Sequence, residues 1–60
     1  MSVYENVCLY ANKKNIPIYL LEQKAGLGNG TIGKWKDGEA TIGSLKKVAD
    51  ALGVDVKKLI

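Results

Sequence analysis

Residues 17–38 read PIYLLEQKAGLGNGTIGKWKDG, and this stretch decides the fold of the chain. Within it, Ile18, Leu21 and Ala25 recur at spacings of three and four residues, which predicts the apolar face of a short helix. Gly26 follows at a position where a left-handed residue commonly ends a helix. The stretch is therefore expected to begin with one short helix that ends in a tight turn.

A second short helix is expected directly after this turn. Ile32 and Trp35 would form its apolar side. Gly28 would stand at its N-cap, and Leu27 would pack against Ile32 as a hydrophobic staple. Two helices joined by a short glycine-containing turn match the helix-turn-helix motif, whose second helix lies in the major groove of DNA. We therefore expect a helix-turn-helix over about residues 17–36.

Further helices on either side are expected to hold this pair at its angle. A first helix over about residues 3–14 would begin at a capping box made by Ser2 and Glu5. Thr41 would cap a fourth helix, and Asp55 would cap a last helical turn or two. The apolar positions expected to face the core from these elements are Val7, Ala11, Ile42, Leu45, Val48, Ala49, Leu52, Val56 and Leu59.

The composition fits one small globular domain. The chain has 60 residues, of which 47% are apolar and 25% are charged. We expect residues 1–60 to form a single all-α domain, a compact bundle of about five short helices. A chain of this length buries only about 60% of the surface that its unfolded form exposes, so a small stability is expected.

The same composition argues against several classes of protein. The chain has no His and one Cys, so neither His-centred acid–base catalysis nor a Cys/His metal cluster is expected. We therefore expect no enzyme, no cofactor and no metal. Cys8 cannot form a disulfide within the chain, which fits the reducing cytoplasm. No apolar run is long enough to span a membrane, so no membrane association is expected.

Nine lysines, no arginine and six acidic residues give the chain a net charge of +3. A basic excess suits an anionic partner such as nucleic acid. Arg is the commonest bidentate reader of guanine, so any reading of guanine here would fall to Lys or to water.

A set of apolar, glycine and threonine residues recurs at characteristic spacings over residues 16–59: Leu21, Gly26, Leu27, Thr31, Ile32, Trp35, Gly38, Leu45, Ala49, Leu52, Gly53, Val54 and Leu59. In these residues the chain resembles the DNA-binding domain of phage Cro and CI-type repressors and their bacterial relatives. The resemblance implies a lambda-repressor-like fold and a transcriptional regulator, in the first place a repressor. It also implies a homodimer that binds a palindromic operator in double-stranded DNA, with the third helix in the major groove.

The resemblance further implies base contacts from the start of the third helix, at Asn29, Gly30, Thr31 and Lys34. Asn29 can pair with the edge of adenine, and Lys34 can donate to guanine. Thr31 could offer its hydroxyl to a phosphate or its methyl group to thymine. Simpler interpretations stay open, since Asn29 could serve only as a helix cap and Lys34 could contact only phosphate. Trp35 is expected in the core rather than stacked on a base.

Phosphate contacts are expected from the start of the second helix and from the region between the third and fourth helices. The residues expected to contact phosphates are Tyr19, Lys36, Thr41 and Ser44. For Tyr19, packing against the domain is an equally open interpretation.

The chain departs from the family pattern in two ways. Several relatives join an Arg of the first helix to a Glu at the end of the third, and here these positions hold Ala11 and Lys36. We therefore expect this junction to be held by packing alone. Gly30 and Gly33 fall on the expected reading face, where each costs roughly 1 kcal/mol of helix propensity relative to Ala. They would either let the backbone approach DNA closely or mark a surface that has lost its side-chain readers.

Val56, Leu59 and Ile60 are candidates for the dimer contact, for attachment to further sequence or for closure of the core. A function of a different class also fits the chain: a protein-interaction module on the same fold, antitoxin-like or anti-repressor-like. The glycine-rich face, the lack of arginine and the modest charge leave room for this alternative. The sequence offers no evident small-molecule site.

Overall fold

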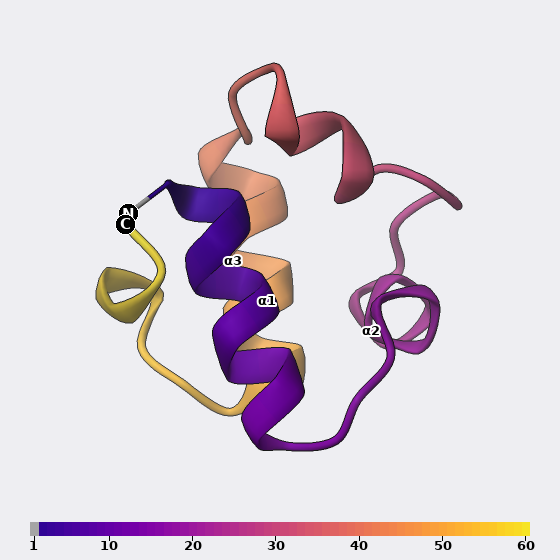
Figure 1. The fold of residues 1–60 in the computed structure, drawn as a ribbon, viewed down its shortest axis with the longest axis vertical. Coiled ribbons are helices and arrows are strands. Elements are labelled where there is room, and N and C mark those ends of the chain that lie inside the picture. The colour runs from indigo at the N-terminus through magenta and orange to yellow at the C-terminus, as the bar shows by residue number, and fades with distance from the viewer. Residues whose placement is uncertain (1) are drawn as a thin grey trace.

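The structure, a computed structural model, describes residues 2–60, and its regular elements are all helices (Figure 1). α1 lies in front of α3 in this view, α2 lies to one side, and the last residues return to the start of α1 (Figure 1). The predicted all-α fold is confirmed for residues 2–60, which contain no strand. Of the five expected helices, the third and fifth are short 3₁₀-helices. In chain order the elements are α1 (Val3–Lys13), α2 (Ile18–Ala25), the 3₁₀-helix η1 (Gly33–Lys36), α3 (Ile42–Leu52) and the 3₁₀-helix η2 (Val56–Lys58).

The core lies where α1, α2, α3 and η1 face one another, and α2 packs against α3. The helical spacings predicted nearly all of the residues that form the core. They also placed Ile42 there, and this prediction is wrong: as the first residue of α3, Ile42 lies at the margin of the bundle and is 58% exposed. The buried apolar residues are Val7, Ala11, Leu21, Ala25, Ile32, Trp35, Leu45, Val48, Ala49, Leu52 and Leu59.

The C-terminal turn is fastened to α1. Leu59 is fully buried, and its carbonyl accepts a hydrogen bond of 3.0 Å from Nδ2 of Asn6. Val56 is half-buried, whereas Ile60 is 68% exposed. Leu59 therefore closes the core, and of the three apolar C-terminal residues Ile60 offers the freest side chain.

α1 begins at the capping box that the sequence predicts. The Ser2 hydroxyl accepts from the Glu5 N–H at 3.1 Å, and the Glu5 carboxylate accepts from the Ser2 N–H at 3.1 Å. The hydrogen bond from the Ser2 backbone, and after it the Ser2 side chain, hold the pKa of Glu5 below its ordinary value.

The starts of α3 and η2 also follow the sequence. The Thr41 hydroxyl accepts from the Ser44 N–H at 3.3 Å and caps α3. The Asp55 carboxylate accepts from the Lys57 N–H at 3.0 Å and caps η2. α2 starts directly after Pro17, which stands at the N-cap without a side-chain hydrogen bond.

All three α-helices end in the same arrangement. A residue with left-handed backbone follows each helix, and the apolar residue after it donates its N–H to a carbonyl five positions earlier. This Schellman motif satisfies carbonyls that the helix leaves free, and it turns the chain back so that the apolar residue packs on the core. The left-handed residues are Asn15, Gly26 and Gly53, and the bonds run from Ile16 to Ala11, from Leu27 to Glu22 and from Val54 to Ala49.

Candidate nucleic-acid interface

Residues 28–36, here called the glycine segment, do not form the regular third helix that the sequence predicts. Residues 29–32 are turns, and the only helical part of the segment is η1. Gly30 has a φ of 85°, in the left-handed region, which interrupts a right-handed helix at this residue. Gly33 adds a second residue of low helix propensity. The predicted helix capped by Gly28 is therefore wrong, because the backbone turns where the helix should start.

The apolar side of the glycine segment is correctly predicted all the same. Ile32 is fully buried and Trp35 is 8% exposed. Both belong to the same core cluster as Leu21 and Ala25 of α2, and Leu27 packs against this cluster from the connecting turn. α2 and the glycine segment therefore share one apolar seam, although the second element is not an α-helix.

A buried carboxylate holds the start of the glycine segment, and its burial was not predicted from the sequence. Glu22 of α2 is 3% exposed. Its Oε1 accepts from the Gly30 N–H at 3.2 Å, and its Oε2 accepts from the Ile32 N–H at 2.9 Å. The signal was present in the sequence, because Glu22 is four residues after Ile18 and so falls within the apolar stripe of α2.

The residues proposed to contact bases are unequally available. Asn29, Gly30 and Lys34 are exposed. Thr31 is half-buried, and its hydroxyl donates to the Gly28 carbonyl at 2.7 Å, so the hydroxyl proton is already used within the segment. The N-cap of η1 is Ile32, not Asn29, which removes the interpretation of Asn29 as a helix cap.

Two proposed phosphate contacts lie on different elements. Tyr19, near the start of α2, is 61% exposed, so the interpretation of a packed Tyr19 is wrong. Lys36, at the end of η1, places its Nζ 5.3 Å from the centre of the Tyr4 ring on α1. Packing alone was expected at this junction, in place of the Arg–Glu ion pair of several relatives. The structure adds a cation–π contact between Lys36 and Tyr4 to that packing.

The other two proposed phosphate contacts act together as the cap of α3. The Thr41 hydroxyl donates to Oγ of Ser44 at 2.9 Å while it accepts from the Ser44 N–H. This arrangement leaves the hydroxyl proton of Ser44 free to donate to a further acceptor. Thr41 therefore serves structure first, and Ser44 is the better placed donor.

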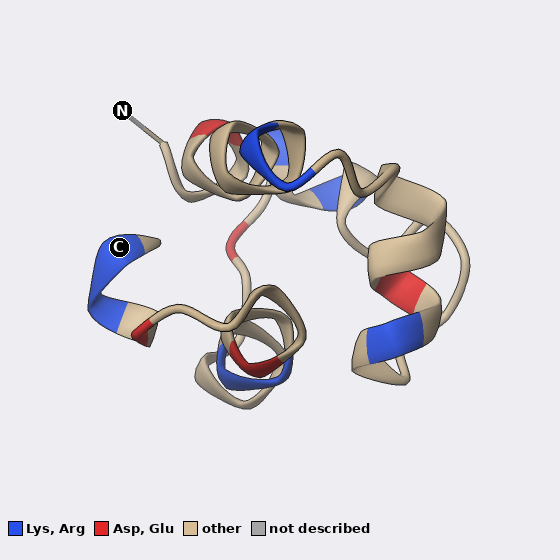
Figure 2. Ribbon diagram, turned by 90° about the horizontal axis from the view of Figure 1, so that it is seen from below, with Lys and Arg blue, Asp and Glu red and all other residues tan. Residues whose placement is uncertain are grey.

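Charge is distributed unevenly over residues 17–36, which hold α2 and the glycine segment (Figure 2). Lys24, Lys34 and Lys36 are exposed, and the one carboxylate of this stretch, Glu22, is buried. All charged side chains that this stretch presents to solvent are therefore positive.

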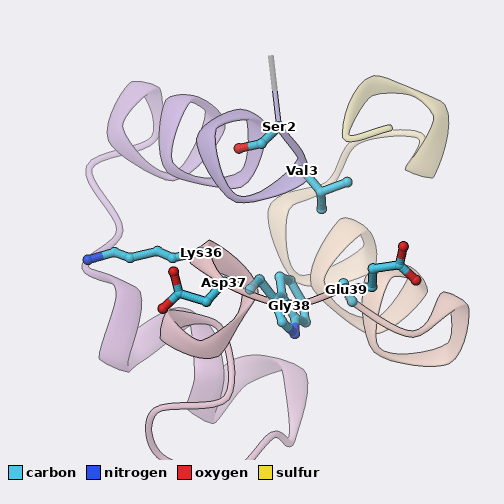
Figure 3. A pocket seen from close by; sticks show the side chains of 8 residues that line it. Ser2, Val3, Lys36, Asp37, Gly38 and Glu39 are labelled. Atoms are coloured by element: carbon cyan, nitrogen blue, oxygen red, sulfur yellow. The ribbon is translucent and has the colours of Figure 1, made fainter.

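A pocket of about 540 Å³ lies between the start of α1 and the chain after η1 (Figure 3). Ser2 and Val3 border it on one side, and Trp35 and residues 36–40 border it on the other. Lys36 is its one lining residue among the eight predicted contact residues, and the Lys36 side chain extends away from it (Figure 3). The pocket is therefore separate from the predicted interface.

Comparison with protein-family models, with curated proteins and with solved structures finds no match to this chain. No helix within residues 2–60 combines the length and apolar character needed to cross a membrane. Within the same residues, no cluster of three or more His, Cys, Asp and Glu side chains could hold a metal ion. The functional assignment below rests on the residues of the interface and their geometry.

Proposed function

We propose that this chain binds double-stranded DNA as a helix-turn-helix regulator, with α2 as the first helix and the glycine segment in place of the second. The shared apolar seam supports the proposal, because Leu21, Ile32 and Trp35 fix the two elements against each other. The left-handed Gly26 makes the turn between them.

The observation that carries the proposal is the one-sided charge of residues 17–36. Within residues 17–36 three lysines are exposed and the one carboxylate, Glu22, is buried, and the exposed Asp37 follows directly. DNA binding proteins need such a surface because each Lys that neutralises a phosphate releases condensed counterions. A solvated surface without this role would be expected to mix both signs of charge.

The exposed residues divide into two kinds of contact. Asn29 and Lys34 would read adenine and guanine edges in the major groove. Gly30, which has no side chain, would let the backbone approach the bases. The Tyr19 and Ser44 hydroxyls, together with Lys36, would donate to phosphates and fix the register of the domain on the duplex.

The size of the domain supports binding as a homodimer to a palindromic operator. Its longest dimension is 24 Å. Half-sites of such regulators are spaced by about 34 Å, one turn of DNA, so a second copy is needed to reach the second half-site. Ile60 is the exposed apolar residue best suited to the contact between copies. As the outcome of operator occupation we propose repression of transcription.

The proposal is tested by selection of bound sequences from a randomised duplex pool at near-physiological salt. Enrichment of a palindrome is expected, together with affinity that falls steeply as salt rises. Lys34→Ala should lower affinity for the enriched sequence by about 1–3 kcal/mol. Lys57→Ala, which removes the same charge from η2, is the matched control and should change it much less. An equal loss of affinity in the two variants would show that Lys34 does not read a base.

A protein-interaction module is the second candidate, and the exposed apolar residues favour it. Ile42 is 58% exposed beside the cap of α3, and Leu9 is 41% exposed on α1. Apolar side chains at these positions suit a protein partner better than phosphate. The absence of DNA binding even at low salt would favour this candidate over the first.

A further inference from the structure

Glu22 is unusual among the carboxylates of the described chain because it is nearly inaccessible to water. A buried carboxylate is costly unless hydrogen bonds replace its hydration. Here each oxygen accepts one backbone N–H, from Gly30 at 3.2 Å and from Ile32 at 2.9 Å. The carboxylate is therefore committed to the backbone of the glycine segment.

These two bonds constrain the turn from the inside. They hold two amides that are two residues apart against one rigid, planar group, which fixes the orientation of Thr31 between them. Thr31 closes the turn from its other end, since its N–H and its hydroxyl both donate to the Gly28 carbonyl, at 3.2 and 2.7 Å. The segment is thus tied down on its protein side, while Asn29 and Gly30 face solvent.

We propose that Glu22 is a positioning residue that fixes the glycine segment in one conformation before DNA binds, so that Asn29 and Lys34 are presented in a set arrangement. The consequence for DNA reading rests on the proposed function. The fixing of the turn is a property of the free protein. The fixing of the turn and its consequence for DNA reading can therefore be tested separately.

Glu22→Gln is the sharpest substitution because it changes one atom. Glutamine keeps one acceptor oxygen and replaces the other with an amino group, which is a donor. A donor facing the N–H of Gly30 or Ile32 loses one hydrogen bond and repels the amide. Glu39→Gln is the matched control, since it makes the same change of atom and charge at an exposed residue beyond η1.

The direct measurement is backbone hydrogen exchange by NMR, with each rate corrected for its intrinsic value. In the unmodified protein, the Gly30 N–H should exchange much more slowly than that of the neighbouring Asn29. Glu22→Gln should lower protection at Gly30 and Ile32 roughly tenfold or more relative to α3 amides, as expected for loss of a bond to a charged acceptor. Glu39→Gln should leave this ratio unchanged.

Two results would overturn the proposal. The first is a loss of protection at Gly30 and Ile32 that merely parallels the loss in α3, because Glu22 would then contribute only to global stability. The second uses the unmodified protein and so does not depend on whether the variant folds. It is an equally fast exchange of Gly30 and Asn29.

The effect on DNA reading is measured by repeating the selection from the randomised duplex pool with both variants. Each variant loses one negative charge, which by itself strengthens binding to any DNA. Glu22→Gln should nevertheless reduce the enrichment of the preferred sequence, whereas Glu39→Gln should retain it. If the unmodified protein enriches no sequence although its Gly30 N–H is protected, the proposed function fails and the fixed turn stands.

Discussion

α3 and the glycine segment follow each other in the chain but are stabilised in opposite ways. α3 contains its own determinants: a cap at Thr41, a buried face and a left-handed glycine at its end. The glycine segment has no side-chain cap for η1, and its turn is held by Glu22, eight and ten residues earlier. α3 is thus specified mainly by local sequence, whereas the glycine segment takes its shape from the domain around it.

This difference has a functional consequence. An α-helix presents its side chains in an order fixed by helical geometry. A turn held by tertiary contacts presents its side chains in an arrangement that a change at a distant residue can alter. The surface proposed to read DNA is therefore expected to respond to substitutions within α2, while α3 serves as the fixed support.

The largest effect is expected from removing the support. Leu52→Ala takes a side chain that is 1% exposed out of the core and should cost about 2–5 kcal/mol. In a domain of this size, such a loss should unfold a large fraction of the molecules at room temperature. Urea denaturation followed by Trp35 fluorescence measures the change. Ile42→Ala is the control on the same helix and should change stability by less than about 0.5 kcal/mol.

Two glycines of the glycine segment should respond with opposite signs. Gly30→Ala forces a side chain into left-handed backbone and should cost about 1–2 kcal/mol. Gly33→Ala meets no atom within 4 Å in η1 and should stabilise the domain by about 0.5–1 kcal/mol. Urea denaturation of the two variants checks both signs. Stabilisation by Gly30→Ala would mean that the segment is a regular helix in solution.

The caps offer a smaller and sharper contrast. Thr41→Ala removes the hydroxyl that accepts the Ser44 N–H and should cost about 1 kcal/mol, measured by thermal unfolding. Asn29→Ala should leave stability nearly unchanged, because Asn29 does not cap η1. A comparable loss in Asn29→Ala would restore the interpretation of this residue as a helix cap.

The smallest effect concerns Glu5. Its pKa is lowered by its bonds to Ser2 in the folded protein, so ionised Glu5 stabilises the fold above the pKa of the unfolded chain. This contribution is lost as the pH falls through the folded-state pKa. A carbon-detected NMR titration should place the midpoint of Glu5 below that of a free glutamate, and Ser2→Ala should raise it. An unchanged midpoint in Ser2→Ala would remove the Ser2 hydroxyl as a cause, because this variant keeps the backbone N–H that also donates to Glu5.

The parts of the fold that depend on neighbouring residues could be predicted from the sequence. Ser2, Thr41 and Asp55 cap helices as expected, and Gly26 and Gly53 end them. These features succeed because caps and helix ends involve bonds between residues only two to five positions apart. The apolar spacing likewise predicted the burial of the core residues.

The parts that depend on distant residues were missed. Helical spacing of Ile32 and Trp35 predicted a regular helix, but this spacing also fits a turn followed by a 3₁₀-helix. The burial of Glu22 was not predicted, because burial of a carboxylate is rare without partners, and its partners are backbone amides that no sequence pattern marks. Exposure of Ile42 depends on where the neighbouring elements end.

We propose above that the glycine segment is the surface that meets DNA. The most direct measurement is a titration of the ¹⁵N-labelled protein with a short mixed-sequence duplex at low salt, followed by amide chemical shifts. If the glycine segment meets DNA, the largest shifts should fall on Asn29, Gly30 and Lys34, with smaller ones at Tyr19 and Ser44 and little change in η2. Shifts centred on η2, or no shifts at any salt concentration, would contradict it.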